Sequence, residues 1–313
     1  MAPTPKFFTT DTLDPPQIIG HEIAGEIIDV GANTTGFAPG DRVQVIAAVP
    51  CEECWACKAG KQGICINQTS MGYQFAGGFA EEMVIPAAVL KANGVNKIPG
   101  DLSFDEASVT EPLACVLNAQ RLVHVGEGDT VLVMGAGPIG CLHVRLARAL
   151  GAKHVMLADI NGDRLALSAN AVRPDRAIDM SSEDLAAIVL EETHGVGPSV
   201  IITAAPAGAA QEQAIAMAAP GGRVSFFGGL PKDKPMIAVD SNVVHYKELI
   251  LAGANGSSPA QNAEALALIA SGKVPVADLI THRMSLENVK GAIDAVTSGD
   301  AIKVVIKPQG VSA

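Results

Sequence analysis

Four cysteines within fifteen residues form the densest group of reactive side chains in the sequence. They follow the spacing Cys51-x2-Cys54-x2-Cys57-x7-Cys65. Four thiolates on one short loop can enclose a tetrahedral zinc ion with no open coordination position, which is typical of structural zinc. An iron–sulfur cluster is the alternative, but bacterial ferredoxin spacing continues with a three-residue gap and a proline. Here the gap is seven residues and Ile66 follows, so the spacing favours structural zinc.

A glycine-rich turn separates an apolar run from a helical pattern. It has the sequence Gly135-Ala-Gly137-Pro138-Ile139-Gly140. In a G-x-G-x-x-G turn the first glycine permits the tight turn, the second lets backbone approach a pyrophosphate, and the third lets helix and strand pack closely. Asp159 lies 19 residues beyond Gly140, at the end of the next expected strand. A carboxylate there accepts hydrogen bonds from ribose hydroxyls and repels a 2′-phosphate, which predicts NAD rather than NADP.

A third group consists of His21 and Glu22, just before an expected strand, and Glu111, in the segment that leads into the glycine-rich part of the chain. Imidazole and carboxylate groups are ligands that catalytic zinc uses. A lone His-Glu pair is more often structural, however, and sequence spacing does not bring these three residues together. They are candidate catalytic zinc ligands only if the fold does so.

Further candidates lie at the ends of expected strands. Thr203 and Phe227 end two of them, and the carboxyl ends of parallel strands line a cofactor crevice. Arg164, five residues after Asp159, is a candidate for the adenosine end of the cofactor or an ordinary solvated helix residue. Cys115 and Cys141 lie in apolar helical stretches and are predicted to be small buried hydrophobic residues.

The elements that must position these residues fall into three parts. Residues 1–116 are strand-like and punctuated by Gly and Pro, with expected strands at 17–30, 41–49 and 78–86, which predicts a small antiparallel barrel or sandwich. Ser103-Phe-Asp-Glu106 has the form of a capping box and predicts a helix start. Residues 117–275 alternate strand and helix, which predicts an α/β parallel sheet with helices on both faces. Residues 276–313 add strand, helix and strand, and are expected to return to the first domain.

Composition excludes several classes of protein. The chain has 313 residues, 48% of them hydrophobic and 18% charged, so it is long enough for two domains with large cores. A net charge of −11 argues against a nucleic-acid partner, because phosphate contacts need clustered Lys and Arg. Residues 1–10 lack the apolar run of a signal peptide, and no long apolar stretch is free of charge, so no membrane partner is expected. Six cysteines in a chain of this length predict a reduced, cytoplasmic setting.

Together these motifs resemble the zinc-containing medium-chain dehydrogenase/reductase (alcohol dehydrogenase) family, and most of all its sorbitol (L-iditol) and threonine dehydrogenase branch. The resemblance covers nearly the whole chain. It is carried by Gly20-His21-Glu22-x2-Gly25-Glu26, Gly40-Asp41-Arg42-Val43, the four cysteines, Gly77-Gly78-Phe79-Ala80-Glu81, Glu111-Pro112-Leu113, the glycines at 135–140 and Asp159.

The resemblance implies a GroES-like catalytic domain over 1–116, a Rossmann NAD-binding domain over 117–275 and an active site between them. It implies a catalytic zinc ion held by His21 and Glu111, with Glu22 as a ligand or a carboxylate that exchanges with water. The zinc would polarise a secondary alcohol of a small polyol-like substrate, and the alkoxide would pass a hydride to NAD. Family members are expected to form homodimers or homotetramers.

One feature departs from the family pattern. Members carry a Cys-Gly-Ser/Thr-Asp motif upstream of the His-Glu pair, and its cysteine is a catalytic zinc ligand. No cysteine lies among the twenty residues before His21, so we expect the GroES-like domain to lack its N-terminal segment. This leaves two alternatives to the dehydrogenase open: an inactive NAD-binding homologue with structural zinc alone, and a zinc-ribbon module for nucleic acid. The acidic charge already disfavours the second.

Overall fold

The computed structural model describes residues 17–310, so the segment in which no signal peptide was expected lies outside the described residues. The chain forms two compact units. One unit contains the chain up to residue 115 together with 256–293 and the residues from 304 onward, and the other contains 116–255 and 294–303. Within residues 17–310, none of the helices is both long enough and apolar enough to cross a membrane.

The unit that begins at residue 116 is built on a six-stranded parallel sheet with the order β11-β10-β9-β6-β7-β8. The strands are β6 (Thr130–Met134), β7 (His154–Asp159), β8 (Arg176–Asp179), β9 (Val200–Thr203), β10 (Arg223–Phe226) and β11 (Ile250–Gly253). The order reverses between β6 and β9, and such a reversal marks the ligand crevice of doubly wound sheets. The predicted α/β Rossmann fold is confirmed.

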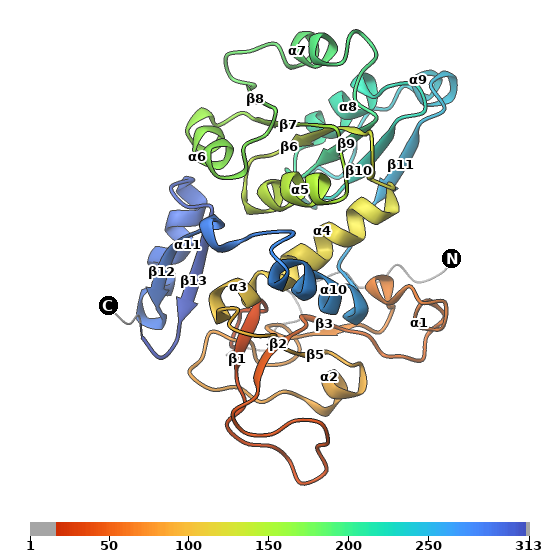
Figure 1. Cartoon of the computed structure of the whole chain (residues 1–313). Coiled ribbons are helices and arrows are strands. Elements are labelled where there is room, and N and C mark those ends of the chain that lie inside the picture. The colour runs from red at the N-terminus through yellow and green to blue at the C-terminus, as the bar shows by residue number, and fades with distance from the viewer. Residues whose placement is uncertain (1–16, 311–313) are drawn as a thin grey trace. The chain divides into compact units, whose positions relative to one another are not determined.

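Helices cover both faces of this sheet (Figure 1). On one face α5 (Pro138–Ala149) and α6 (Gly162–Val172) contact each other and strands β6 to β8. On the other lie α7 (Leu185–Glu192), α8 (Gly208–Met217) and α9 (Ser241–Tyr246). Because both faces are covered, the central strands are apolar throughout: Val131–Met134 and Val200–Thr203 are completely or almost completely buried.

The other unit has small antiparallel sheets. One has the order β1-β2-β5, and β3 pairs with β4. The strands are β1 (Ile23–Glu26), β2 (Arg42–Val45), β3 (Ala48–Val49), β4 (Thr69–Ser70) and β5 (Val95–Lys97). The strand predicted at 78–86 is wrong, because this segment contains only bends and loop. Its first residues instead bind the loop that carries His21, as described below.

Short helices and a two-stranded C-terminal sheet complete this unit. The α-helices are α1 (Trp55–Lys58), α2 (Ala87–Lys91), α3 (Phe104–Ser108), the first turns of α4 (Thr110–Leu122), α10 (Pro259–Ala270) and the start of α11 (Val289–Ser298). The 3₁₀ turns are η2 (Gln62–Ile64), η3 (Ala277–Leu279) and η4 (Leu286–Asn288), and β12 (Ile280–Ser285) pairs with β13 (Lys303–Lys307). The predicted capping box at Ser103 is present with both of its hydrogen bonds.

Candidate functional site

The four predicted cysteines converge in the loop around α1 and η2. Their four Sγ atoms all lie within 4.8 Å of one another. The Sγ of Cys54 is 3.6 Å from the Sγ of Cys57 and 3.8 Å from the Sγ of Cys65. Four sulfurs bound tetrahedrally to zinc would lie roughly 3.8 Å apart, given a zinc–sulfur bond of about 2.3 Å. The loop therefore fits one zinc ion with four thiolate ligands.

Backbone N–H groups around this loop point at the sulfurs. The N–H of Cys51 donates to the Sγ of Cys65 at 3.3 Å. A hydrogen bond from the backbone N–H of Cys57 lowers the pKa of Cys54 to about 6, whereas burial raises the pKa of Cys57 to about 12. Hydrogen bonds from backbone N–H groups thus favour the thiolate form of a cysteine. Four neighbouring thiolates would repel one another, however, so they cannot all ionise unless a cation lies among them. Zinc supplies that charge, so the donor set fits the ion electrostatically as well as in size.

His21, Glu22 and Glu111 also meet. One donor atom from each of these residues lies within 4.8 Å of the other two. Glu111 is 9% exposed, while His21 and Glu22 are partly exposed. One imidazole and two carboxylates gathered in this way form the donor set of a catalytic zinc site. Sequence spacing could not establish this convergence, which the structure shows within one unit.

Glycines at 72, 77 and 78 hold the loop that carries His21. Backbone N–H groups of Gly77 and Gly78 donate to the carbonyls of Ile18 and Gly20 at 2.8 and 2.9 Å. The approach is too close for any side chain: a Cβ on Gly77 would lie 2.3 Å from the carbonyl oxygen of Gly20. Gly20 itself has a φ of +96°, which favours glycine. This packing fixes the backbone immediately before His21 and explains the Gly-Gly-Phe motif.

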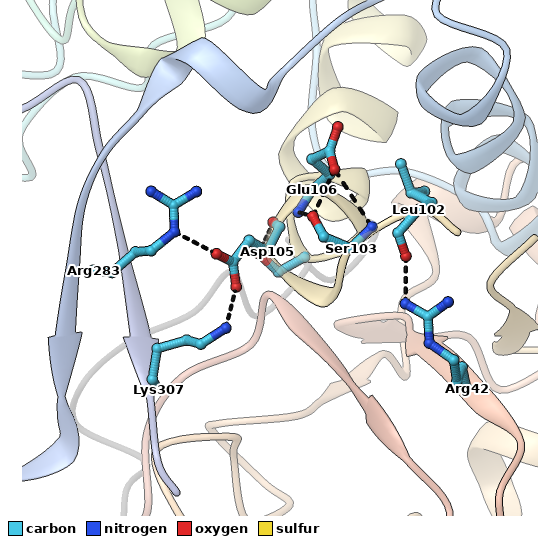
Figure 2. A network of polar contacts seen from close by, with 8 residues as sticks. Arg42, Leu102, Ser103, Asp105, Glu106, Arg283 and Lys307 are labelled. Carbon is cyan, nitrogen blue, oxygen red and sulfur yellow. Dashed lines mark hydrogen bonds and ion pairs between the residues drawn. The ribbon is translucent and has the colours of Figure 1, made fainter. Parts of the chain in front are cut away.

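Glu111 is positioned by the segment that precedes it. The apolar residues Phe104 and Ala107 of α3 pack in one cluster with Ala24 of β1, so α3 lies beside the strand that follows His21 and Glu22. Figure 2 shows the polar contacts of α3. Asp105 accepts hydrogen bonds from Nε of Arg283 at 2.6 Å and from Nζ of Lys307 at 2.7 Å.

The Asp105 carboxylate is charged at neutral pH. Burial raises its pKa, but the hydrogen bonds from Lys307 and Arg283 outweigh burial, and the net pKa lies below the ordinary value. The carboxylate therefore ties β12 and β13, which come from the far end of the chain, to the helix just before Glu111. No sequence pattern indicated this connection.

Cys115 was expected to be a small buried hydrophobic residue, and its thiol is desolvated as expected, but the thiol also contacts a carboxylate. The residue keeps some exposed surface, and its Sγ lies 3.7 Å from Oε1 of Glu111, one helical turn earlier on α4. Desolvation of the thiol raises its pKa well above the ordinary value, and the carboxylates of Glu111 and Glu22 raise it further.

Cys141 is fully buried, as predicted. No sequence motif pointed to Tyr73, whose ring centroid lies 5.8 Å from that of His21.

The glycine turn joins β6 to α5 as the motif requires. Gly135 has a φ of +117°, and a Cβ there would be 3.1 Å from the backbone nitrogen of Ala205. A Cβ on Gly140 would lie 1.8 Å from the carbonyl oxygen of Gly135, so the helix can approach the strand only with glycine. Nothing lies within 4 Å of the Cβ position of Gly137, which leaves room for a ligand beside its backbone. Pro138 and Ile139 begin α5 at the same turn.

The Asp159 carboxylate is buried beside this turn. Its Oδ2 accepts a hydrogen bond from the N–H of Ala136 at 2.6 Å, and its Oδ1 accepts one from Asn161 at 2.8 Å. The acid and the glycine turn therefore lie together at the carboxyl ends of β6 and β7. Arg164 lies in the first turn of α6, where its N–H donates to the Asn161 side chain, and its guanidinium lies close to Gly299.

The two remaining cofactor candidates lie at the ends of β9 and β10. The Thr203 hydroxyl is buried and donates to the carbonyl of Ser225 at 3.3 Å. The Phe227 ring packs edge-on against His143 with centroids 4.8 Å apart. Burial lowers the pKa of His143 to about 3, so it is neutral and acts as a packing residue. Thr203 and Phe227 thus lie at the carboxyl ends of β9 and β10, and the hydroxyl of Thr203 is already engaged.

The chain is similar to known proteins over most of its length. Residues 5–94 match the alcohol dehydrogenase GroES-like domain, and residues 138–271 match the zinc-binding dehydrogenase family. The L-threonine 3-dehydrogenase of Anaeromyxobacter dehalogenans is 32% identical over 295 residues, which cover 94% of this chain and 83% of that protein. The enzyme of the same name from Pseudoalteromonas atlantica is 30% identical over 96% of this chain and 85% of its own length.

Solved structures resemble the whole fold. The crystal structure of a Sinorhizobium meliloti protein bound to NADP has a TM-score of 0.86 at 28% identity and covers 95% of this chain and 85% of its own. An Escherichia coli alcohol dehydrogenase complexed with NADH has a TM-score of 0.84 at 29% identity, over 93% of this chain and 84% of its own.

Proposed function

The chain belongs to the zinc-containing medium-chain dehydrogenase family, and from that premise we propose that it oxidises a secondary alcohol to a ketone with NAD as the hydride acceptor. The products are the ketone, NADH and a proton. The observation that carries the proposal is the convergence of His21, Glu22 and Glu111, whose donor atoms lie within 4.8 Å of one another. A separate four-cysteine site in the same unit fits a structural zinc ion.

Each residue of the cluster has a distinct role in this proposal. The imidazole of His21 and the carboxylate of Glu111 would hold the metal ion, and a zinc ion bound there would polarise the substrate hydroxyl and lower its pKa. Glu22 is partly exposed and adjacent to His21, so its carboxylate can exchange with water or with the incoming hydroxyl. Glu111, buried and at the start of a helix, keeps a fixed position.

The glycine turn and Asp159 select the cofactor. Gly137 exposes backbone at the N-terminus of α5, where the partial positive charge of a helix favours a pyrophosphate. Asp159 places a negative charge beside the turn, which favours ribose hydroxyls and disfavours a 2′-phosphate. The related structures hold NADH in one case and NADP in another, so the preference for NAD rests on Asp159.

We favour a small polyol or sugar alcohol as the substrate. A carboxylate from Glu111 in place of a thiolate makes a harder and more polar metal site, which suits a polyhydroxylated substrate. L-Threonine is the second candidate, because threonine dehydrogenases are about a third identical to this chain over most of its length.

The direct test measures metal content and turnover on the same preparation. The full chain, loaded with zinc, should contain two zinc ions and should reduce NAD with at least one member of a panel of polyols and L-threonine. Reduction of NADP should be much slower. One bound zinc ion with no turnover on any substrate would contradict the proposal and favour the NAD-binding alternative with structural zinc alone.

A further inference from the structure

The aromatic ring of Tyr73 lies against the imidazole of His21. The two ring centroids are 5.8 Å apart, and the ring planes are inclined by 41°. A favourable contact between two aromatic rings has its centroids roughly 4.5 to 7 Å apart, so the pair lies within that range. Tyr73 is half-buried, and it belongs to the same unit as His21. The histidine of the proposed metal site is therefore packed against a second aromatic side chain.

The backbone segments that carry these two rings touch each other immediately before them. Gly20 precedes His21, and Gly72 precedes Tyr73. A Cβ on Gly72 would lie 2.9 Å from the carbonyl oxygen of Gly20 and 3.1 Å from its nitrogen. Both glycines have a positive φ, +96° at Gly20 and +77° at Gly72. The fold thus fixes the two side chains at neighbouring starting points.

Tyr73 lies on a turn that is anchored on both sides. The carbonyl of Ser70 accepts hydrogen bonds from the N–H groups of Tyr73, Gln74 and Phe75 at 3.3, 3.1 and 3.0 Å. The Ser70 N–H in turn donates to Oε1 of Gln74 at 2.9 Å. Met71 is completely buried, and Phe75 packs against the same apolar core cluster. The backbone of Tyr73 therefore cannot move away from His21 unless these contacts break.

The His21 side chain gains most from such a neighbour. It is partly exposed, and a partly exposed imidazole can turn about its side-chain bonds unless packing restricts it. A histidine that binds a metal ion must keep its ring in one orientation, and residues outside the ligand set that fix this orientation change metal affinity by roughly 10- to 100-fold. A ring held on a rigid turn can restrict the imidazole in this way.

We infer that Tyr73 is a positioning residue for the metal site, and that its ring sets the orientation of the His21 imidazole toward the ion. This inference rests on the proposed function, since it needs a metal ion bound by His21, Glu22 and Glu111. Tyr73 acts through His21 and makes no bond to the ion. The effect comes from the aromatic ring and not from the phenol hydroxyl, so phenylalanine should replace Tyr73 and an aliphatic side chain should not.

Cobalt(II) measures both the affinity and the geometry of the site, because its visible absorption bands change with the arrangement of its ligands. The full chain, with zinc kept in the four-cysteine site, would be titrated with cobalt. Tyr73→Phe keeps the ring, whereas Tyr73→Leu and Tyr73→Met remove it. Tyr246→Leu is the control, because Tyr246 is 80% exposed and belongs to the other unit. Circular dichroism and retained zinc show which variants are folded, and Tyr73→Met decides the outcome if Tyr73→Leu is not.

The variants without a ring should bind the second metal at least roughly 10-fold more weakly than wild type and should show altered visible bands. Tyr73→Phe and Tyr246→Leu should match wild type, and every folded variant should keep the zinc of the four-cysteine site. Wild-type affinity and bands in Tyr73→Leu or Tyr73→Met would overturn the role of Tyr73 and leave the proposed function intact. An equal loss in Tyr73→Phe would also overturn it, because the hydroxyl would then be responsible. Failure of wild type to bind a second metal would overturn both proposals.

Discussion

The two metal sites of the GroES-like unit are built in opposite ways. The four-cysteine loop takes all its ligands from fifteen consecutive residues, and its own backbone N–H groups point at the sulfurs. The His21–Glu22–Glu111 cluster joins residues ninety positions apart and relies on packing between a glycine-lined loop, β1 and α3. One site is local and closed, whereas the other is assembled by the fold.

This difference has a functional consequence. A closed cage of four thiolates leaves no position for substrate, so its ion can only stabilise the loop. An assembled cluster of a few ligands can keep a position open, but its geometry depends on distant contacts such as those of Asp105 with Arg283 and Lys307. Changes near the first site should therefore affect stability, and changes near the second should affect turnover.

The largest expected effect is that of Glu111→Ala on turnover. Loss of this carboxylate removes a metal ligand, and we expect kcat/KM to fall by on the order of 1,000-fold, equivalent to about 4 kcal/mol of transition-state stabilisation. The zinc of the four-cysteine site should stay bound, and the unfolding midpoint should change little. Steady-state kinetics and elemental analysis measure both. Glu82→Ala, which removes an exposed carboxylate of the same unit, is the control. Equal turnover in the two variants would refute the assignment of Glu111.

Cys57→Ser should give the opposite pattern. Serine cannot replace the thiolate as a zinc ligand, and loss of a structural metal is among the few changes that cost about 4 kcal/mol or more. We expect loss of one zinc ion and a corresponding fall in the free energy of unfolding of this unit, measured by denaturant titration. Cys141→Ala, at a buried cysteine in the other unit, should retain both metals. Retention of two zinc ions in Cys57→Ser with unchanged stability would contradict the structural role of the four-cysteine site.

The same contrast explains what could be predicted from sequence. The cysteine loop could be predicted in full because ligand identity, number and spacing are all local. The glycine turn and Asp159 could be predicted because β6, the turn and β7 follow one another along the chain. The cluster of His21 with Glu111 could only be anticipated through resemblance, since tertiary packing creates it. The contact of the Cys115 thiol with Glu111, one helical turn earlier, was not predicted, because the neighbouring residues are apolar.

Two elements of secondary structure show the same limit. The segment 78–86 contains the apolar run Met83-Val84-Ile85, but its first residues bind the His21 loop instead, and close approach there requires glycine. Strand β8 was not anticipated because Arg176-Ala-Ile-Asp179 is short and polar at both ends. It forms because its backbone continues the parallel ladder of β7. In both cases a partner distant in sequence determines the local structure.

Asp105→Asn should have a smaller effect on the assembled site. The carboxylate is nearly buried, but Arg283 and Lys307 are partly exposed, so we expect a loss of about 2 kcal/mol in unfolding free energy. Affinity for the second metal should weaken, because α3 precedes Glu111, while the four-cysteine site keeps its zinc. The control is Asp101→Asn, which removes one exposed charge nearby. Equal second-metal affinity in both variants would contradict this link.

The effect of Asp105→Asn should also depend on pH. Because the pKa of Asp105 is lowered in the folded state, its contribution to stability is complete above the unfolded pKa of about 3.9 and disappears as pH falls through the folded-state pKa. The difference in stability between wild type and variant should therefore be constant near neutral pH and close below about pH 4. A difference that grew with acidification would have the wrong sign.

Glu52→Gly should have the smallest effect and tests how far the cysteine loop depends on backbone alone. Glu52 has a φ of +63°, which glycine adopts without strain, so the substitution relieves roughly 1 kcal/mol. It also removes the hydrogen bond from Gln62 to the Glu52 carboxylate and makes the unfolded chain more flexible, each costing about 1 kcal/mol. The backbone N–H of residue 52, which points at the Cys57 sulfur, remains. We therefore expect unchanged zinc content and a shift in unfolding free energy of no more than about 1 kcal/mol. Loss of zinc in Glu52→Gly would mean that side chains as well as backbone hold this loop together, and the distinction between the two sites would be weaker than we propose.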